Sequence, residues 1–454
     1  MQEAAAIRLP IEIHVIEATA ILLYLLGTKE GVSMEIQLEL PRFSIGVGDR
    51  FAHQAKAQLQ ACILANEAGV SVIPVWNKSN REHTIIGSQP SEARSAANAA
   101  VRDLGWTNPY FLDADHINLK TVQRFIEPCD FFTLDVADLI GQQPADEADV
   151  RAFVSLHPEL IGDVLIPDVD EPFHIDRAFV EAVANKFLVA VKHASEIYQL
   201  LAKTKGVGQF ITEISMDETD SPQTPVELLI ILAMIADSKI PIQTIAPKFT
   251  GRFNKGVDYA GDLSKFAKEF NDDLATIAFA VRTYGLPKNL KLSVHSGSDK
   301  FSIYPTIHQA IQRSGAGVHL KTAGTTWLEE LIGLAEGGGT GLALAKDIYA
   351  EAYAHMDQLT APYASVIDIK ASKLPEPEAV KGWTSKQFTG ALRHDEENPE
   401  YNQSFRQLLH VGFKVAANMG TRYLEELKAN EELVAKNVTE NLYERHIKPI
   451  FLGT

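Results

Sequence analysis

The sequence predicts a (β/α)8 barrel, and three observations support this fold. Apolar runs of strand length recur between residues 43 and 324, and a helical pattern follows each run. The runs are almost continuously apolar, which is typical of parallel strands covered by helices. There are eight of them, the number of strands that closes such a barrel. A doubly wound open sheet is the competing fold.

The predicted strands and helices follow one another in regular order. Thr224 and Pro225 give one helix a cap and a first-turn proline, and a second helix ends at Gly285 after apolar residues at helical spacing. These helices cover residues 224–238 and 262–285. The predicted strands lie at 43–49, 70–77, 109–115, 130–137, 209–215, 240–248, 290–297 and 316–324.

The remaining segments divide the chain around this barrel, which we place at residues 43–345. Residues 1–42 form an N-terminal segment, and residues 346–454 read as a helical C-terminal extension packed on the barrel. Two connections are unusually long, at about 141–205 and 249–262. Both follow strands, so in a barrel they would lie at the C-terminal face, where active sites form.

Composition excludes several classes of function. The 454-residue chain is 46% hydrophobic and carries a formal charge of -17, and no basic run alternates with aromatic residues. Nucleic acid and anionic membranes are therefore not expected partners. Cys62 and Cys129 form no CxxC pair, which argues against a disulfide framework or a cysteine zinc site. The apolar run 20–27 is too short for a bilayer and lacks signal-peptide flanks, so we expect a cytoplasmic protein.

Polar residues collect where the predicted strands end. In a barrel these side chains would converge on one cavity, and buried charges are costly unless they are paired or bind a metal. A single histidine in a strand is more often part of a hydrogen-bonded core, and we keep that interpretation for His157, His308 and His355. The strand-end residues are Asp49, Arg50, Asn77, Lys78, Arg81, Asp113, Asp115, His116, Asp135, Glu213, Ser215, Asp217, Lys248, His295, Ser296, Asp299, His319 and Lys321.

The mixture of imidazoles and carboxylates predicts a divalent metal site. Asp115 and His116 end one strand, His295 precedes a Ser-Gly-Ser turn, and Glu213 ends a third strand. Such ligands suit zinc, manganese, nickel or cobalt, and no thiolate narrows the choice.

Seven long blocks resemble the tagaturonate/fructuronate epimerase family, over roughly residues 43–450. The resemblance implies hexuronate catabolism in bacteria, a divalent metal and inversion of one carbinol carbon; related enzymes interconvert fructose and tagatose. The first forty residues do not match the larger N-terminal portion of that family. The blocks are "SIGVGDRFAHQAKAQL", "PVWNKSNREHTIIG", "YFLDADHINLKTVQRFI", "FFTLDVADLIG", "EISMDETDSPQTPVELL", "APKFTGRFNKGVDY" and "LSVHSGSDKFSIYP".

This activity sets a chemical requirement. Tagaturonate and fructuronate differ at a carbon β to the ketone, whose C–H bond the ketone does not acidify. Enolisation therefore cannot invert it, whereas retro-aldol cleavage can, because the aldehyde turns over before the bond re-forms. A divalent metal would polarise the ketone. The "DADH" segment resembles the Asp-His pair of class II aldolases, and "HSGSD" resembles, more loosely, a metal-histidine loop of those barrels.

We infer the roles of individual residues from this chemistry. The expected metal ligands are His116, Glu213 and His295, with His319 as a fourth candidate. Asp115 is the first choice for the acid/base on the β hydroxyl, and Asp217 is the second. The expected substrate-binding residues are cations for the carboxylate and polar groups for the sugar: Arg81, Lys248, Lys321, Asn77, Ser296 and Gly297.

Other functions use the same residues. A metal-dependent sugar aldolase or a keto-sugar isomerase would need a similar site, and a sugar-binding regulator would need neither the metal nor Asp115. The expected partner is a small uronate or ketohexose, and a homo-oligomer is compatible with the sequence.

Overall fold

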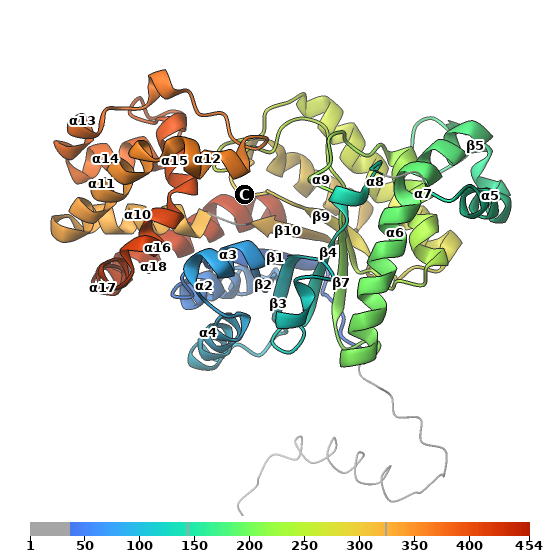
Figure 1. Ribbon diagram of the computed structural model, residues 1–454, viewed down its shortest axis with the longest axis horizontal. Helices are drawn as coiled ribbons and strands as arrows, with labels where there is room; N and C mark the ends of the chain where they lie inside the picture. Colours follow the sequence, from blue (N-terminus) through green and yellow to red (C-terminus); the bar gives the residue numbers. More distant parts are fainter. Residues whose placement is uncertain (1–36, 143–144, 323–324) are drawn as a thin grey trace, which may run out of the picture. The chain divides into compact units, whose positions relative to one another are not determined.

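The computed structural model describes residues 37–142, 145–322 and 325–454, and its centre is a closed barrel of parallel strands (Figure 1). The first strand pairs with both the second and the last, so the sheet has no edge. The predicted barrel is therefore confirmed, and the open sheet is excluded. In chain order the eight strands are β1 (Phe43–Gly48), β2 (Ile73–Ser79), β3 (Phe111–Ile117), β4 (Phe131–Asp135), β7 (Ile211–Ser215), β8 (Thr244–Ala246), β9 (Lys291–Val294) and β10 (Val318–Thr322).

Helices follow most of the strands and bury their apolar faces against the barrel. The two helices predicted at residues 224–238 and 262–285 are present. Thr224 accepts a hydrogen bond from the Glu227 backbone and completes a capping box, which fixes the start of α7. Gly285 has a φ of 70° and ends α8 in the left-handed conformation that glycine adopts without strain. The helices around the barrel are α2 (Ala55–Glu67), α3 (Asn80–Ile86), α4 (Pro90–Asp103), α6 (Arg177–Lys205), α7 (Pro225–Asp237), α8 (Leu263–Tyr284) and α9 (Tyr304–Ser314).

The two long connections differ in content. The segment 141–205 contains a helix, a short antiparallel hairpin and α6, the long helix that connects β4 to β7. The inserted elements are α5 (Glu147–Leu156), β5 (Gly162–Val164) and β6 (Phe173–Ile175). The segment 249–262 is an irregular loop between β8 and α8, closed by an isolated bridge between Arg252 and Ala260. This second loop will prove important for the site.

A second hydrophobic core lies in the helices that follow β10. Within these helices the core begins at Trp327 on α10. The predicted boundary at 345 lies further along the chain, inside the next helix, α11. The principal helices are α10 (Thr325–Gly337), α11 (Gly339–Ala354), α12 (Met356–Thr360), α13 (Pro377–Lys381), α14 (Ser385–Leu392), α15 (Gln403–Val411), α16 (Phe413–Met419), α17 (Thr421–Ala429) and α18 (Glu431–Leu442). The last element, η7 (Tyr443–Leu452), returns to pack against α2 and α9 of the barrel.

A buried ion pair joins this helical region to the barrel. Asp299 follows β9, and its Oδ2 accepts a hydrogen bond of 2.8 Å from Arg406 on α15; both side chains have no exposed surface. Burial would raise the pKa of Asp299, but Arg406 and the nearby histidines hold it well below its usual value. Arg406 also donates to the Gly256 carbonyl in the 249–262 loop. The helical region therefore fixes two loops at the C-terminal end of the barrel.

Within the described residues, no helix is both long and apolar enough to cross a bilayer.

Candidate functional site

A cavity of about 280 Å³ lies at the C-terminal ends of the barrel strands. Side chains from β2 and β3 and from the loops after β7 and β9 line it, and the helical region contributes Tyr363 and His410. Eight of the predicted site residues line this cavity: Asn77, Arg81, Asp115, His116, Asp217, His295, Ser296 and Lys321. The other four, Glu213, Lys248, Gly297 and His319, do not.

A bulge in β3 brings His116 into the cavity. Successive residues of a regular strand face opposite sides, so Asp115 and His116 should point apart. Between Ala114 and Ile117, however, the register with β4 shifts, and His116 has a φ of 49°. Bulges re-aim side chains in this way and are over-represented next to active sites. Both Asp115 and His116 consequently face the cavity.

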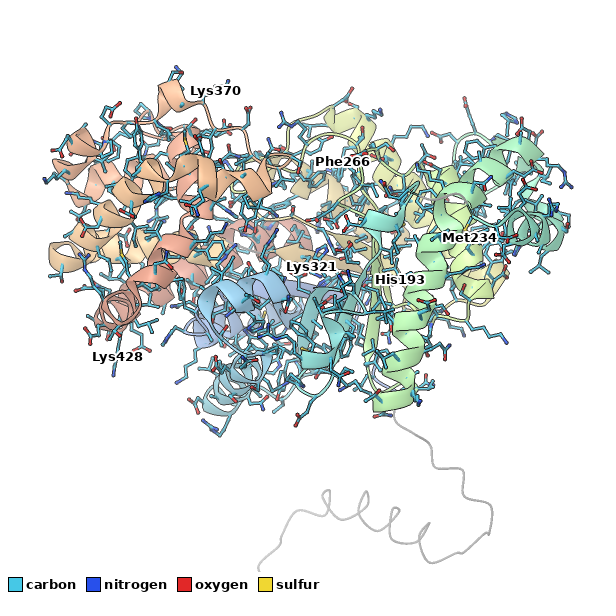
Figure 2. All side chains as sticks on the ribbon, viewed as in Figure 1. His193, Met234, Phe266, Lys321, Lys370 and Lys428 are labelled. Atoms are coloured by element: carbon cyan, nitrogen blue, oxygen red, sulfur yellow. The ribbon has the colours of Figure 1, made fainter. Side chains whose placement is uncertain are left out.

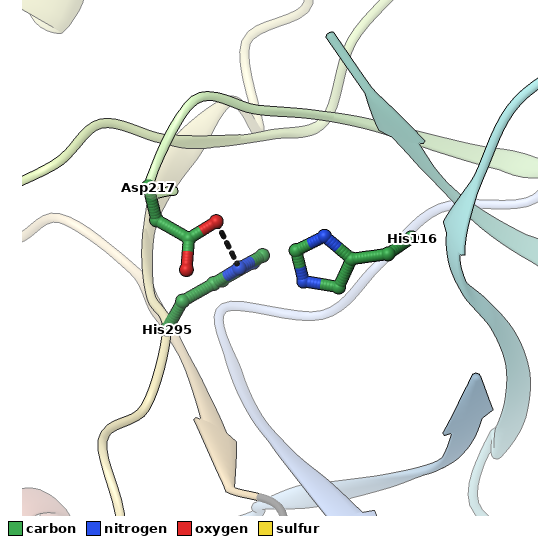
Figure 3. A group of neighbouring side chains, drawn as sticks. All are labelled: His116, Asp217 and His295. Atoms are coloured by element: carbon green, nitrogen blue, oxygen red, sulfur yellow. Dashed lines mark ion pairs between the residues drawn. The ribbon is translucent and has the colours of Figure 1, made fainter. Parts of the chain in front are cut away.

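Three of the cavity side chains could hold a metal ion together. One ligand atom from each of His116, Asp217 and His295 lies within 4.8 Å of the others (Figure 3). His295 Nδ1 is 3.2 Å from Asp217 Oδ1, and the two imidazole rings are 5.3 Å apart between centroids. The group in the structure thus contains Asp217, whereas the sequence had suggested Glu213 and His319 as the ligands beside the two histidines.

Glu213 lies behind His295. Its Oε1 accepts a 2.7 Å hydrogen bond from His295 Nε2, which leaves His295 Nδ1 directed at Asp217. Thr133 also donates to the same carboxylate oxygen, at 3.0 Å. Histidines that bind metals commonly donate their second N–H to a carboxylate, which fixes the ring and its tautomer. The geometry therefore places Glu213 behind His295, where it can orient the imidazole ring.

His319 is held away from the group. Its Nδ1 shares a 2.8 Å hydrogen bond with Ser44 Oγ, and its ring lies 5.5 Å from that of Phe131. Burial lowers the pKa of His319 to about 3, so the imidazole is neutral. Gly46 leaves room for it, because a Cβ at that position would lie 3.3 Å from His319 Nε2. His319 is thus part of the polar packing inside the barrel.

Carboxylates dominate the electrostatics around the two imidazoles. Burial alone would lower the pKa of His116, but Asp115, Asp135 and Asp217 outweigh it and raise the pKa to about 10. Burial likewise opposes the charged form of His295, and Asp217 and Glu213 again raise the pKa. Several carboxylates therefore surround the two imidazoles, and this excess of negative charge favours a bound cation.

Lys321 occupies the centre of the barrel and is fully engaged. Its Nζ lies 2.8 Å from Asp113 Oδ2, 2.8 Å from Asp115 Oδ1 and 3.2 Å from Glu213 Oε1, and it donates to Thr133 Oγ1 at 2.5 Å. The strands that carry these partners are not neighbours of β10, so the contacts cross the barrel interior. Lys321 therefore has no free donor for a substrate carboxylate, the role that the sequence had suggested.

Lys321 also contributes to the difference in pKa between the two aspartates on β3, Asp113 and Asp115. Burial raises the pKa of Asp113 to about 6, with help from the neighbouring carboxylates and against the effect of Lys321. Burial acts on Asp115 as well, but there Lys321 and His116 prevail and lower the pKa to about 2. Asp115 is accordingly an ionised base that faces the cavity.

Two further expected substrate contacts are engaged elsewhere. Lys248 Nζ donates to the Thr219 carbonyl. The Gly297 N–H donates to the Lys321 carbonyl at 3.1 Å, and a Cβ at Gly297 would lie 2.5 Å from Leu320. Gly297 is therefore required for close packing and offers no backbone donor to a sugar.

Several residues that line the cavity were not predicted from the sequence, among them Lys255, Tyr363 and His410. Lys255 lies in the Gly-rich loop 249–262, whose length and position were a signal for it. Tyr363 and His410 come from the helical region, where nothing in the local sequence marks them.

Comparison with known proteins decides the family. The model of the tagaturonate epimerase family matches residues 33–450. The chain belongs to this family. A tagaturonate/fructuronate epimerase from Thermotoga maritima is 28% identical over 421 residues, which are 89% of this chain and 80% of that protein. The family resemblance and the prediction of a carbohydrate epimerase are both confirmed.

Solved structures of this family share the fold. The fructuronate-tagaturonate epimerase of Cohnella laeviribosi, crystallised with two glycerol molecules, matches with a TM-score of 0.75 and 22% identity, over 92% of this chain and 83% of that one. Its native crystal structure matches with a TM-score of 0.72 and 22% identity, over 90% and 81% of the two chains.

The position of Lys321 generates a prediction about stability. Lys321→Met keeps much of the side-chain length but leaves three buried carboxylates without their cation. Removing one partner of a buried ion pair costs about 3–5 kcal/mol, and we expect the free energy of unfolding in urea to fall by that amount. Asp113→Asn should restore part of the loss in the Lys321→Met background. The control is Lys428→Met on α17, an exposed lysine far from the barrel strands (Figure 2). Equal stability of Lys321→Met and the unaltered protein would contradict this account.

Proposed function

We propose that the protein interconverts tagaturonate and fructuronate, with a divalent metal bound by His116, Asp217 and His295. Membership of the tagaturonate epimerase family supports the reaction. The observation that carries the metal is the approach of the three ligand atoms to within 4.8 Å of one another in the wall of the cavity.

The residues present fit a catalytic metal. Three protein ligands leave coordination positions open for substrate, as in other catalytic sites. Ser215 donates to Asp217 Oδ1 at 2.6 Å and Glu213 holds the far nitrogen of His295, so two of the three ligands have supporting hydrogen bonds. When bound, a divalent metal supplies a Lewis acid that polarises the ketone. Two nitrogens and one oxygen are compatible with zinc, manganese, nickel or cobalt.

Asp115 is the residue that we assign to proton transfer. The bond between the carbons α and β to the ketone breaks when the β hydroxyl loses its proton, which gives an aldehyde and an enediolate. Asp115 lines the cavity next to His116, so it is the carboxylate that is placed to accept that proton. Once the aldehyde has turned its other face, the carbon–carbon bond re-forms and Asp115 returns the proton to the new hydroxyl. Lys321 keeps Asp115 ionised and in place.

Asn77 and Ser296 are our candidates for contacts to the sugar hydroxyls. Both line the cavity, and Asn77 Oδ1 is buried without a hydrogen-bond partner among the described residues. Ser296 directly follows His295 and has a φ of 50°, which turns the chain sharply beside the proposed ligand.

An aldolase is the second candidate, since it would use the same proton transfer and release the aldehyde. The family match favours the epimerase, because the chain belongs to the tagaturonate epimerase family. Tyr363 and His410 of the helical region also line the cavity, and the Asp299–Arg406 ion pair anchors that region to the barrel.

Carbon-13 NMR tests the reaction and the need for a metal together. The metal-loaded protein should convert fructuronate into an equilibrium mixture with tagaturonate. Exhaustive chelation should abolish the conversion, and a divalent ion should restore it. Full activity of the chelated protein would contradict the metal site, and release of free aldehyde without epimer would favour the aldolase.

Elemental analysis distinguishes the ligands from the orienting residue. His116→Ala, Asp217→Asn and His295→Ala should each lose bound metal, whereas Glu213→Gln should retain it at saturating metal, with affinity weakened by roughly 10–100-fold. Loss of metal in Glu213→Gln together with its retention in Asp217→Asn would reverse the two assignments.

Asp115→Asn tests the proton transfer. The substitution keeps the size of the side chain and removes the base, so kcat should fall by at least ~10²-fold, while bound metal is unchanged. Asp138→Asn, an exposed aspartate just after β4, is the control. A near-normal kcat in Asp115→Asn would show that another group carries the proton.

A further inference from the structure

A second chamber of about 420 Å³ adjoins the cavity. Its own walls are formed by the loop 249–262 and by residues 362–366 of the helical region. Seven residues line both spaces and connect them: Arg81, Asp217, Glu218, Lys255, His295, Ser296 and Tyr363. The second chamber thus begins beside two of the proposed metal ligands.

Most cations around the two spaces are already satisfied. Lys321 is bound to three carboxylates, and Lys248 donates to a backbone carbonyl. Lys300 is fully buried and donates to the carbonyls of Asn254, Val257 and Ser298 at 2.7–2.8 Å. Arg50 Nε lies 3.2 Å from Glu82 Oε1. None of the three lysines can turn to an incoming anion without losing an established hydrogen bond, and the charge of Arg50 is offset by Glu82.

Lys255 and Arg81, which line both spaces, differ from these cations, and a further cation, the exposed Arg252, lines the second chamber alone. Neither Lys255 nor Arg81 makes an ion pair with any residue that the structure describes. Lys255 Nζ has one side-chain hydrogen bond, to Ser296 Oγ at 3.5 Å, which is at the limit of a bonding distance. Arg81 lies over the ring of Tyr363, with its guanidinium carbon 4.9 Å from the centroid. Its hydrogen-bond donors therefore stay available while the ring fixes its plane.

The backbone of Lys255 is held in place by the helical region. Its N–H donates to the Val366 carbonyl at 2.8 Å, and its carbonyl accepts from Gln407 Nε2 at 3.1 Å. Lys255 thus presents an ammonium group without an ion pair among the described residues from a fixed loop, at the junction of the two spaces, which the carboxylates of Asp217 and Glu218 also line. A group that is positioned before binding loses less entropy when its partner arrives.

We propose that Lys255 binds the carboxylate of the hexuronate substrate, with Arg81 as the second cation, at the entrance to the second chamber. The proposal rests on the proposed function and identifies the residue that selects an acidic sugar over a neutral ketohexose. It replaces Lys248 and Lys321 in that role.

This placement has a mechanistic consequence. Retro-aldol cleavage gives a three-carbon aldehyde that still carries the carboxylate, and the carbon to be inverted is its aldehyde carbon. Held by its carboxylate, the fragment can turn the aldehyde about the adjacent carbon–carbon bond without leaving the cavity. Asp115 takes the proton from the β hydroxyl of one epimer and returns it to the new hydroxyl of the other epimer, so no further reactant is required.

Kinetics of Lys255→Met with two substrates test this inference. Because a hydrogen bond to a charged group is involved, kcat/KM for fructuronate should fall by roughly 10–150-fold, mainly through a higher KM. For fructose, which has no carboxylate, the change should be less than about threefold. Lys255→Arg should recover most of the loss, which would also show that the loop tolerates substitution. Arg81→Met should shift the same preference in the same direction.

Lys414→Met is the matched control. Its Nζ lies 5.4 Å from the centroid of the Tyr363 ring, but the residue lines neither space, so the preference should not change. An equal loss for both sugars in Lys255→Met, or an unchanged preference for fructuronate, would overturn the inference. If the unaltered protein epimerises neither sugar, the proposed function fails instead, which separates the two.

Discussion

The bonding of Lys321 to Asp113, Asp115 and Glu213 is the constraint on which the site depends. Three carboxylates inside a barrel would be very costly without a cation, and their mutual repulsion would protonate them or open the structure. One lysine from β10 offsets this cost by reaching across to β3 and β7. Asp115 then stays ionised as a base, and Glu213 stays ionised as the acceptor that orients His295. The lysine thus determines both the base and the orientation of a proposed ligand.

Two local features of the structure complete the site next to this ion cluster. The bulge in β3 allows adjacent residues, Asp115 and His116, to face the same cavity. The Asp299–Arg406 pair ties the helical region, which contributes Tyr363 and His410 to the cavity wall, to the loop after β9. The first feature brings the proposed base and a proposed ligand together, and the second positions the helical residues beside them. In this account the helical region is therefore part of the active site and not an appendage.

The sequence predicted the barrel well because the signal was local and repeated. Eight apolar runs separated by helical patterns are compatible with few folds. The polar residues at the strand ends also predicted a cavity at the C-terminal face of the barrel, which the structure contains. The grouping of the candidate ligands in the structure differs from the one expected from the sequence where the geometry departs from a regular strand. Alternation suggested that Glu213 and Asp217 project together, but β7 ends at Ser215, so Glu213 stays inside the barrel while Asp217 lies at its rim. No pattern revealed the bulge at His116, and Tyr363 and His410 reach the cavity through long-range packing that no local sequence encodes.

The fate of one hydrogen atom tests the central claim most directly. Retro-aldol inversion breaks a carbon–carbon bond and leaves the C–H bond of the inverted carbon intact. Fructuronate deuterated at that carbon, incubated with the metal-loaded protein in ordinary water, should therefore give tagaturonate that retains its deuterium, as measured by mass spectrometry. Loss of the deuterium to solvent would contradict the account, because it would mean that Asp115 or another base removes the proton from carbon itself.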